Sequence, residues 1–294
     1  MKILISDAFD PSLPDRLKEL GEVTDDTSQL PETDVVLVRS KTKCTKEYID
    51  GAPNLKLIIR GGVGLDNVDL DYAQSKGIEV RNTPEASSVA VAELAFALML
   101  AIPNRIVEAH NSMAQGEWLK KQMKRSELMG KTLGLIGVGR IGTVVANRAR
   151  AFGMHVIGYD CYVEYSDLVE LKSFEDVLAN SDYISLHVPL CVETEGMINK
   201  ETIAMMKDGV VIINTGRGKC VVEQDLVDAL ESGKVKAFGT DVWYSDPPPK
   251  DCPLLKAPNV VMTPHIGAST KENLLRIGDQ IVEILKGFQQ KKGE

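Results

Sequence analysis

The chain has 294 residues, of which 26% are charged, and its formal net charge is −8. This length gives room for one large or two ordinary domains, and the acidic balance argues against general binding to nucleic acid or to anionic membranes. The five cysteines are scattered, without a CxxC pair or a Cys/His cluster, which predicts reduced thiols in a cytoplasmic protein without a metal site.

Short apolar runs alternate with helical patterns in the first 82 residues. Strands are predicted at 2–6, 34–40, 55–60 and 78–82. Helical patterns occupy 11–21 and 69–77, and each closes on a glycine suited to a helix C-terminus. This alternation is typical of βαβ units, which form a parallel sheet covered by helices on both faces.

A long apolar segment separates this series from a second one. Residues 88 to about 115 predict one helix with a kink at Pro103, and its most apolar part, 94–102, is too short to span a bilayer. The second series predicts strands at 131–138, 155–160, 182–188, 209–215, 235–242 and 259–265. A last amphipathic helix is predicted at 269–288. The two series predict two α/β domains, each a doubly wound parallel sheet.

The spacing of Gly137, Gly139 and Gly142 matches the G-x-G-x-x-G turn of dinucleotide-binding domains. A strand leads into these glycines and a helix leaves them, so the helix N-terminus can offer its free N–H groups to a pyrophosphate. Asp160 ends the next strand, 18 residues after Gly142, where its carboxylate can accept hydrogen bonds from a ribose diol. A carboxylate would repel a 2′-phosphate, so this pattern favours NAD over NADP. The alternative is a tight turn that binds no ligand.

Four strand ends carry groups suited to chemistry. His265 is the best candidate for proton transfer near neutral pH, and His187, which precedes Pro189, is suited to lining a cofactor site. Arg217 lies between two glycines, which leaves its guanidinium room to bind a carboxylate with two hydrogen bonds. The glycines of 60–67 can expose backbone N–H groups to an anion. The alternatives are a loop histidine, a solvated arginine and a flexible turn, none with a role in binding.

Seven segments, taken in order, resemble the D-isomer-specific 2-hydroxyacid dehydrogenases. They are RGGVGLDNVD, VAVAELAFALML, GKTLGLIGVGRIG, HVPL, INTGRG, GTDVW and TPHIGAST, and they extend over nearly the whole chain. The resemblance implies a Rossmann cofactor domain, residues 98–266, inserted into a flavodoxin-like substrate domain, residues 1–97 and 267–294. It also implies that the last helix returns to the first domain, and that an arm at 98–125 joins two copies in a homodimer.

The resemblance further implies catalytic roles. Arg217 would bind the substrate carboxylate and carbonyl, and His265 would donate or accept the proton. The family places an aspartate near the nicotinamide and, before a proline, a glutamate that pairs with the histidine. In DVWYSDP these positions are Asp241 and Asp246, so the second acid is one methylene shorter here. Family members that act on formate carry glutamine there, which argues against that branch.

The same motifs imply the contacts to NAD and to a small 2-hydroxy or 2-keto acid. The cofactor would meet residues of the glycine turn, of the strand ends and of the loops after them: Gly137, Gly139, Arg140, Ile141, Gly142, Asp160, His187, Pro189, Thr194, Thr215, Asp241 and Gly267. The substrate would meet residues of the first domain: Arg39, Arg60, Gly62, Val63, Gly64 and Ser87. Ser87 stands where family members often have asparagine.

Within the family, the segments GLDNVDL and PHIGASTKEN resemble the phosphoglycerate dehydrogenases most. This implies NAD-dependent oxidation of a D-2-hydroxy acid, 3-phosphoglycerate to 3-phosphohydroxypyruvate in serine biosynthesis. Hydroxypyruvate and glyoxylate reductases are the first alternative, and an NAD-sensing corepressor is an alternative from another class of protein. Because the chain stops soon after its last helix, without the C-terminal regulatory domain of many phosphoglycerate dehydrogenases, serine is not expected to inhibit it by that route.

Overall fold

The computed structural model describes residues 1–293, and the side chains of residues 1–290. The chain forms two compact units. Unit 1 combines Met1–Ser87 with the segment that begins at Ala268, and unit 2 is Ser88–Gly267. The chain therefore leaves unit 1 once and returns to it once. The expected boundary after residue 97 comes 10 residues too late, because it falls within a helix that packs on the sheet of unit 2.

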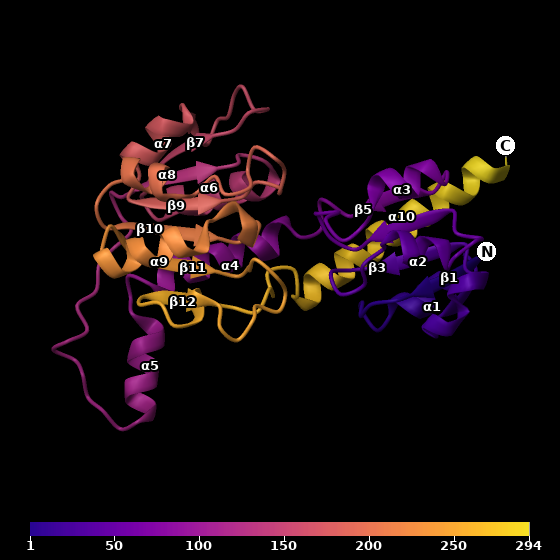
Figure 1. Ribbon diagram of the computed structural model, residues 1–294, viewed down its shortest axis with the longest axis horizontal. Coiled ribbons are helices and arrows are strands. Elements are labelled where there is room, and N and C mark those ends of the chain that lie inside the picture. The colour runs from indigo at the N-terminus through magenta and orange to yellow at the C-terminus, as the bar shows by residue number, and fades with distance from the viewer. Residues whose placement is uncertain (294) are drawn as a thin grey trace. The chain divides into compact units, whose positions relative to one another are not determined.

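Unit 1 is built on a five-stranded parallel sheet (Figure 1). The strands lie in the order β2-β1-β3-β4-β5, which is the flavodoxin-like order with its switch point between β1 and β3. Their bounds are β1 Lys2–Ile5, β2 Glu22–Thr24, β3 Val35–Val38, β4 Leu57–Arg60 and β5 Glu79–Asn82. Four of them lie within predicted runs, whereas β2 escapes prediction because its three residues are too few to show a period.

The last helix of the chain completes the core of unit 1. The helices of this unit are α1 Leu13–Leu17, α2 Lys46–Asp50, α3 Leu70–Ser75 and α10 Lys271–Gly293, with a 3₁₀ turn at Thr27–Glu32. On α10, Ile277, Ile281 and Leu285 recur at helical spacing and are fully buried against strand residues such as Ile3 and Ile59. Burial of each such side chain contributes about 1.5–3 kcal/mol, so unit 1 depends on this helix for its stability.

Unit 2 contains a seven-stranded parallel sheet in the order β12-β11-β10-β9-β6-β7-β8. The bounds are β6 Thr132–Ile136, β7 His155–Tyr159, β8 Glu170–Leu171, β9 Tyr183–Leu186, β10 Val210–Asn214, β11 Val235–Thr240 and β12 Val260–Met262. The sheet grows from β6 in one direction through β7 and in the other through β9. This is the doubly wound order with its switch point between β6 and β9. The two-residue β8 is the strand here that escapes prediction.

The predicted long helix is wrong in one respect, because it is two helices with a bend of 66° between them. The helices of unit 2 are α4 Ser88–Ala101, α5 Ile106–Ala114, α6 Arg140–Ala151, α7 Phe174–Asn180, α8 Lys200–Met205 and α9 Glu223–Ser232. Pro103 lacks the N–H that a continuing helix requires, and Arg105 adopts the left-handed backbone conformation with a φ of 52°. Among residues 1–293 no single helix is long and apolar enough to cross a membrane, and α4 and α5 meet that criterion only as a bent pair.

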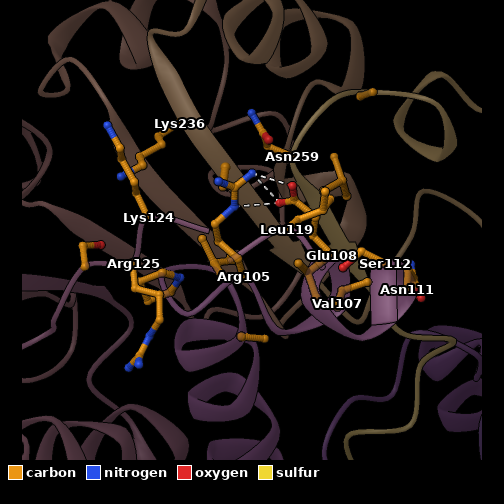
Figure 2. Close-up of a pocket in the computed structure, with 18 of the residues that line it drawn as sticks. Arg105, Val107, Glu108, Asn111, Ser112, Leu119, Lys124, Arg125, Lys236 and Asn259 are labelled. Atoms are coloured by element: carbon orange, nitrogen blue, oxygen red, sulfur yellow. Dashed lines mark hydrogen bonds and ion pairs between the residues drawn. The ribbon is translucent and has the colours of Figure 1, made fainter. Parts of the chain in front are cut away.

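α5 and the segment after it extend from the rest of unit 2 (Figure 1). A cavity of about 770 Å³ lies beside α5, between residues 117–126 and the start of β11 at Lys236 (Figure 2). Arg105 donates Nε and Nη2 to the carboxylate of Glu108, each at 2.6 Å, and donates Nη1 to the carbonyl of Gln122 at 2.7 Å. This arginine therefore ties the returning segment to the start of α5.

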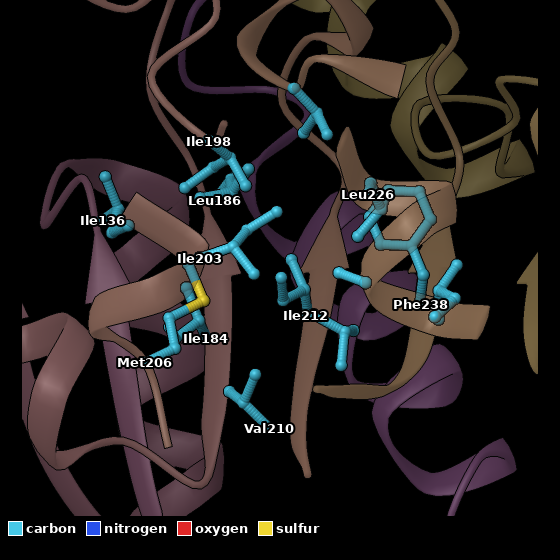
Figure 3. Packing of buried hydrophobic residues seen from close by; sticks show 14 of the residues in the cluster. Ile136, Ile184, Leu186, Ile198, Ile203, Met206, Val210, Ile212, Leu226 and Phe238 are labelled. Carbon is cyan, nitrogen blue, oxygen red and sulfur yellow. The ribbon is translucent and has the colours of Figure 1, made fainter. Parts of the chain in front are cut away.

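The central strands of unit 2 are buried on both faces. Every residue of β9 and β10 is buried, which explains why these strands are mostly apolar and show no alternation of apolar and polar residues. Figure 3 shows the packing on one face, where Ile184, Ile212 and Phe238 of the sheet lie near Ile203 of α8 and Leu226 of α9. A close-packed core of this kind holds the ends of the strands in fixed positions.

Candidate functional site

Predicted site residues follow the carboxyl ends of six neighbouring strands of unit 2. They are Gly137 after β6, Asp160 after β7, His187 after β9, Thr215 after β10, Asp241 after β11 and His265 after β12. Because the strands are parallel and adjacent, these residues lie along one edge of the sheet. Doubly wound sheets bind their ligands at this edge, near the switch point. The fold therefore brings together groups that are more than 120 residues apart at their extremes.

The glycine turn joins β6 to α6 tightly. A Cβ at position 142 would lie 2.2 Å from the carbonyl oxygen of Gly137, so only glycine fits at Gly142. Gly139 is the N-cap of the 12-residue helix α6, whose first N–H groups have no partner within the helix. Asp160 fixes the turn from the side of β7, because its carboxylate accepts the amide of Val138 at 2.8 Å. The helix N-terminus and the acidic strand end therefore stand at the same turn.

Three features of this edge fit a dinucleotide. A Cβ at Gly139 would meet no atom within 4 Å, so the backbone there is open to a phosphate group. Two buried polar atoms, Oγ1 of Thr215 and Nδ1 of His187, have no hydrogen-bond partner among residues 1–293. Such atoms cost free energy, and a bound cofactor would supply partners for them. The carboxylate of Asp160 suits a ribose diol and would repel a 2′-phosphate.

The loop after β9 is closed by its own hydrogen bonds. The hydroxyl of Thr194 donates to the carbonyl of Pro189 at 2.7 Å and accepts the amide of Cys191 at 2.9 Å. Pro189 is thus held at a fixed place in this exposed loop. Arg140 and Ile141, two further predicted cofactor residues, form the first turn of α6. These predicted contacts all lie at the amino end of α6 or in the loops at the same edge.

His187 is partly buried at the end of β9. Its Nε2 pairs with Oγ of Ser185 at 2.9 Å, and its amide donates to the carbonyl of Ile136 at 2.8 Å. Burial lowers the pKa of His187 from 6.5 to about 4, because a charged ring would lose its hydration. His187 is therefore neutral near pH 7, and it contributes shape and hydrogen bonding to this edge.

This neutral histidine predicts a pH dependence of stability. Below pH 6.5 the unfolded chain binds a proton at His187, whereas the folded chain does so only near pH 4, so the free energy of unfolding falls across that window. At pH 5 this loss should be on the order of 2 kcal/mol. Urea unfolding gives the free energy of unfolding at pH 7.5 and at pH 5. The decrease between these two pH values should be smaller in H187Q than in the wild type, by the loss stated above. H155Q, at an exposed strand start, should match the wild type, and equal losses in H187Q and wild type would contradict the account.

His265 lies in the loop after β12 and adopts a left-handed backbone conformation with a φ of 55°. Its Nδ1 forms a hydrogen bond with the carboxylate of Asp246, which lies in the loop after β11. The aspartate therefore reaches the ring, although it is one methylene shorter than a glutamate. A carboxylate at Nδ1 holds the N–H on that side and leaves Nε2 to exchange a proton with another group.

Arg217 lies in the loop after β10. The side chain of Asn214 shapes this loop, because its Nδ2 donates to the carbonyl of Arg217 at 2.9 Å and its Oδ1 accepts the amide of Gly216 at 3.0 Å. Nη1 of Arg217 donates to the carbonyl of Gly216 at 2.8 Å, which bends the side chain back over its own loop. Arg217 as a whole is only partly buried.

Trp243 joins the loop of Arg217 to the loop of His265. A Cβ at Gly218 would lie 2.0 Å from the carbonyl carbon of Trp243, so glycine at 218 lets the two loops touch. The indole Nε1 of Trp243 donates to the carbonyl of Thr263 at 3.1 Å. The loops after β10, β11 and β12 therefore form one connected structure that presents an arginine, an aspartate and a histidine.

Arg39 and Arg60 of unit 1 lie at the ends of the paired strands β3 and β4, where Val38 stands opposite Arg60. Nη1 and Nη2 of Arg39 donate to the carbonyls of Ala8 and Ala268, each at 3.4 Å. Burial lowers the pKa of Arg39, yet a guanidinium keeps its charge in proteins. Two cations therefore stand at one edge of the sheet of unit 1.

The predicted anion site at 61–64 is smaller than expected. The amide of Gly61 donates to the carbonyl of Val38, and the amide of Gly62 donates to Oγ1 of Thr83 at 2.7 Å. These two donors anchor the turn to the neighbouring strands, so Val63 and Gly64 are the part of the turn that a substrate could use. Ser87, a further predicted substrate residue, is buried in unit 1 and accepts a hydrogen bond from Nδ2 of Asn273 at 3.2 Å.

Comparison with known proteins decides the family. Residues 96–267 match the family model for the NAD-binding domain of D-isomer-specific 2-hydroxyacid dehydrogenases. The chain is 51% identical over 257 residues to a hydroxypyruvate reductase of Thermotoga maritima, which covers 86% of this chain and 84% of that protein. The chain belongs to the D-isomer-specific 2-hydroxyacid dehydrogenase family. It is an NAD-dependent dehydrogenase, and the matched residues place NAD binding in unit 2.

Two further relatives are dehydrogenases that act on different acids. It is 43% identical over 304 residues to a D-3-phosphoglycerate dehydrogenase of Methanocaldococcus jannaschii, which covers 98% of this chain but 58% of that protein. The chain thus spans little more than half of this relative. A solved D-lactate dehydrogenase of Aquifex aeolicus, complexed with NAD and lactic acid, has a TM-score of 0.88 and 35% identity over 99% of this chain and 96% of that one.

Sequence reasoning missed the residues that shape the loops of this dehydrogenase. Asn214, Trp243 and Thr263 lie within the motifs INTGRG, GTDVW and TPHIGAST. Their amide, indole and hydroxyl groups are not residue types that indicate proton transfer. Only their position could have pointed to them, because each comes within three residues of a predicted catalytic or cofactor residue. Only the folded loops reveal that Asn214 and Trp243 bind backbone groups and that the hydroxyl of Thr263 donates to the carboxylate of Asp241.

Proposed function

We propose that this dehydrogenase oxidises 3-phosphoglycerate to 3-phosphohydroxypyruvate with NAD, a step of serine biosynthesis. The observation that carries the proposal is the pair of His265 and Asp246 beside the loop of Arg217, at neighbouring strand ends of the NAD-binding unit. Oxidation of a 2-hydroxy acid needs a base for the hydroxyl proton and a cation for the carboxylate. These loops offer one group of each kind.

The proton passes through His265. Asp246 at Nδ1 selects the tautomer whose Nε2 is free to accept the hydroxyl proton, and its negative charge stabilises the ring once it is protonated. In the reverse direction the same Nε2 returns the proton to the keto oxygen. The glycine turn and Asp160 would hold NAD, whose nicotinamide would accept the hydride that leaves C2.

Arg217 orients the substrate. A guanidinium can bind both oxygens of a carboxylate through parallel N–H groups, which fixes C1 and therefore the direction in which the hydroxyl on C2 points. Fixing the reacting groups in this way lowers the barrier because the loss of rotational freedom is already complete when the substrate binds. The hydroxyl is then presented to Nε2 of His265 rather than to water.

The phosphate of the substrate is assigned to unit 1. Arg39 and Arg60 stand at the ends of neighbouring strands, and two cations at one sheet edge suit a dianion. Val63 and Gly64 are assigned to the substrate as backbone donors. A substrate without the phosphate would leave these arginines without their anion, so the phosphorylated acid should bind more tightly.

A matched pair of substrates tests this assignment. We expect kcat/KM for 3-phosphohydroxypyruvate to exceed that for hydroxypyruvate, and R60Q to lower only the former, by roughly ten- to a hundredfold, since a hydrogen bond to a charged group contributes about 1.5–3 kcal/mol. R81Q, at an exposed position on β5, is the control and should behave as the wild type. Equal kcat/KM values for the two substrates would sink the phosphate assignment.

Reduction of hydroxypyruvate or glyoxylate is the second candidate. It is favoured by the 51% identity to the hydroxypyruvate reductase, which this chain covers more completely than the phosphoglycerate dehydrogenase. Both candidates use the same roles for Arg217 and His265, so variants at these residues do not separate them. The same substrate pair does, because a reductase of this kind should prefer the acid without the phosphate.

We infer that two copies associate through the arm at 98–125, which includes α5. This arm exposes large apolar side chains, with Trp118 75% exposed and Ile106 56% exposed, and exposed apolar clusters of this kind mark interaction surfaces. Figure 2 shows the cavity beside the arm, which a partner's side chains could fill. The tie from Arg105 to Gln122 holds the arm in shape before association.

W118E tests the arm. A tryptophan at the centre of an interface contributes 2 kcal/mol or more, so a buried charge there should raise the dissociation constant of the dimer by about 30-fold or more. Sedimentation velocity over a range of concentrations should show wild-type dimers and a shift of W118E toward monomers. M205E, at an exposed site on α8, should leave the dimer intact. A wild type that is monomeric at micromolar concentration would contradict the inference.

A further inference from the structure

We propose that two buried side chains, Asn214 and Asp241, are positioning residues that set the two reactive loops separately. Asn214 sets the loop of Arg217, and Asp241 sets the loop of His265. The proposal rests on the roles proposed above for Arg217 and His265. Neither Asn214 nor Asp241 needs to touch the substrate, because each acts through the backbone of the loop that it holds.

Asn214 is the last residue of β10 and is only 1% exposed. Its amide uses both ends on one loop, accepting from Gly216 at 3.0 Å and donating to the carbonyl of Arg217 at 2.9 Å. Its backbone carbonyl accepts the amide of Asp241 at 3.0 Å, which anchors it to the neighbouring strand. An amide is required here, because a single side chain must both accept and donate.

Asp241 follows β11 and is also 1% exposed. Its carboxylate accepts three hydrogen bonds from the loop of His265, namely from Oγ1 of Thr263 at 2.6 Å, from the amide of Ile266 at 2.8 Å and from the amide of Gly267 at 2.7 Å. These donors flank His265 on both sides. A carboxylate is required here, because all three partners donate, and an ionised carboxylate only accepts.

The two residues act on different loops although they are neighbours. Thr240 is the register partner of Asn214 in the sheet, so Asn214 and Asp241 project from adjacent strand ends. Trp243 links the loops once more, through Gly218 and Thr263. This link keeps the loops together, while the side chains of Asn214 and Asp241 fix where each reactive group lies. Separate effects on substrate binding and on turnover follow from this arrangement.

Isosteric exchanges break these contacts without changing volume. In N214D one oxygen still accepts from Gly216, but the other meets the carbonyl of Arg217, and two acceptors repel each other. In D241N one end of the side chain becomes a donor, so at least one of the three loop donors loses its partner whichever way the amide is oriented. Each exchange therefore displaces one loop.

The test combines steady-state kinetics of both variants with NADH affinity measured by fluorescence. We expect N214D to raise KM for the keto acid by about tenfold or more, with a smaller change in kcat. We expect D241N to lower kcat by roughly a hundredfold, the cost of displacing a reactive group by about 1 Å, with a smaller change in KM. Because Thr215, Asp241 and Gly267 are among the predicted cofactor contacts, NADH affinity can fall in both variants. The values of kcat and KM are therefore compared at saturating NADH, where a loss of NADH affinity does not enter them.

Matched controls are N180D on α7 and D251N beyond the proline run, both at exposed positions and both expected to keep wild-type kinetics. If N214D or D241N fails to fold, N214S and T263V, which each remove one of the contacts, should shift KM and kcat in the same two directions.

A change in NADH affinity alone, a change in melting temperature alone, or the same kinetic profile in both variants would overturn the proposal. If H265A and R217Q keep full turnover, the proposed function itself fails, whatever N214D and D241N do.

Discussion

H265A is expected to lower kcat by about a hundred- to ten-thousandfold, which is the usual contribution of a positioned proton-transfer group. The ring that is lost is the group held by Asp246 through Nδ1. Without it, the proton must be exchanged with water, which has neither a fixed position nor a suitable pKa. Binding of NADH, which depends on the glycine turn, should change little. Stopped-flow or steady-state reduction of the keto acid, with NADH absorbance as the signal, measures the loss.

H155A provides the matched control for this change. His155 begins β7 at an exposed position, on the opposite end of the sheet from the carboxyl ends of the strands. Its replacement should leave kcat within about twofold, as surface substitutions usually do. If H265A kept near-normal turnover with NADH and the preferred substrate, His265 would not be the proton-transfer group.

R217Q is expected to lower kcat/KM for the 2-keto acid by roughly 30- to 5,000-fold. This range corresponds to about 2–5 kcal/mol, the cost of truncating one partner of a hydrogen-bonded charge pair. Glutamine can offer one hydrogen bond but no charge, so both the affinity for the carboxylate and the orientation of C2 suffer. Initial rates over a range of keto acid concentrations, at saturating NADH, give kcat and KM separately.

Two companion variants sharpen this result. R217K keeps the charge but loses the planar pair of donors, so it should stay well below the wild type. R150Q, at an exposed site on α6, should be unaffected. An R217Q enzyme with unchanged kcat/KM would remove Arg217 from substrate binding, and recovery of full activity in R217K would show that charge alone is sufficient.

Much of the fold is predictable because its central strands are buried. β9 and β10 are buried along their whole length and mostly apolar, so composition marks them, and glycines mark several helix ends. Prediction fails where an element is too short to show a period or where its ends are set by packing against other elements. β2 and β8 are too short to show a period, and the break between α4 and α5 needs the left-handed Arg105 as well as Pro103. The domain boundary is misplaced for a related reason, since only the contacts of α4 show which sheet it covers.

In the candidate site, too, some features can be predicted from the sequence and others depend on the folded structure. Groups whose chemistry is visible in the residue type, such as His265, Arg217 and the glycines of the turn, can be found from motifs and strand ends. The reach of Asp246 could not be predicted, because it depends on how the loop brings the shorter side chain to the ring. The use of the amides of Gly61 and Gly62 within unit 1 also depends on neighbouring strands that the local sequence does not describe.

The central claim is that this dehydrogenase uses NAD to oxidise a D-2-hydroxy acid held by Arg217 and His265. A panel of D- and L-2-hydroxy acids and of 2-keto acids, phosphorylated and not, assayed with NAD(H) and with NADP(H), tests it most directly. We predict turnover of D-2-hydroxy acids with NAD, highest kcat/KM for the 3-phosphoglycerate and 3-phosphohydroxypyruvate pair, and much weaker activity with NADP because of Asp160. Turnover of only L-acids, or a preference for NADP, would contradict it.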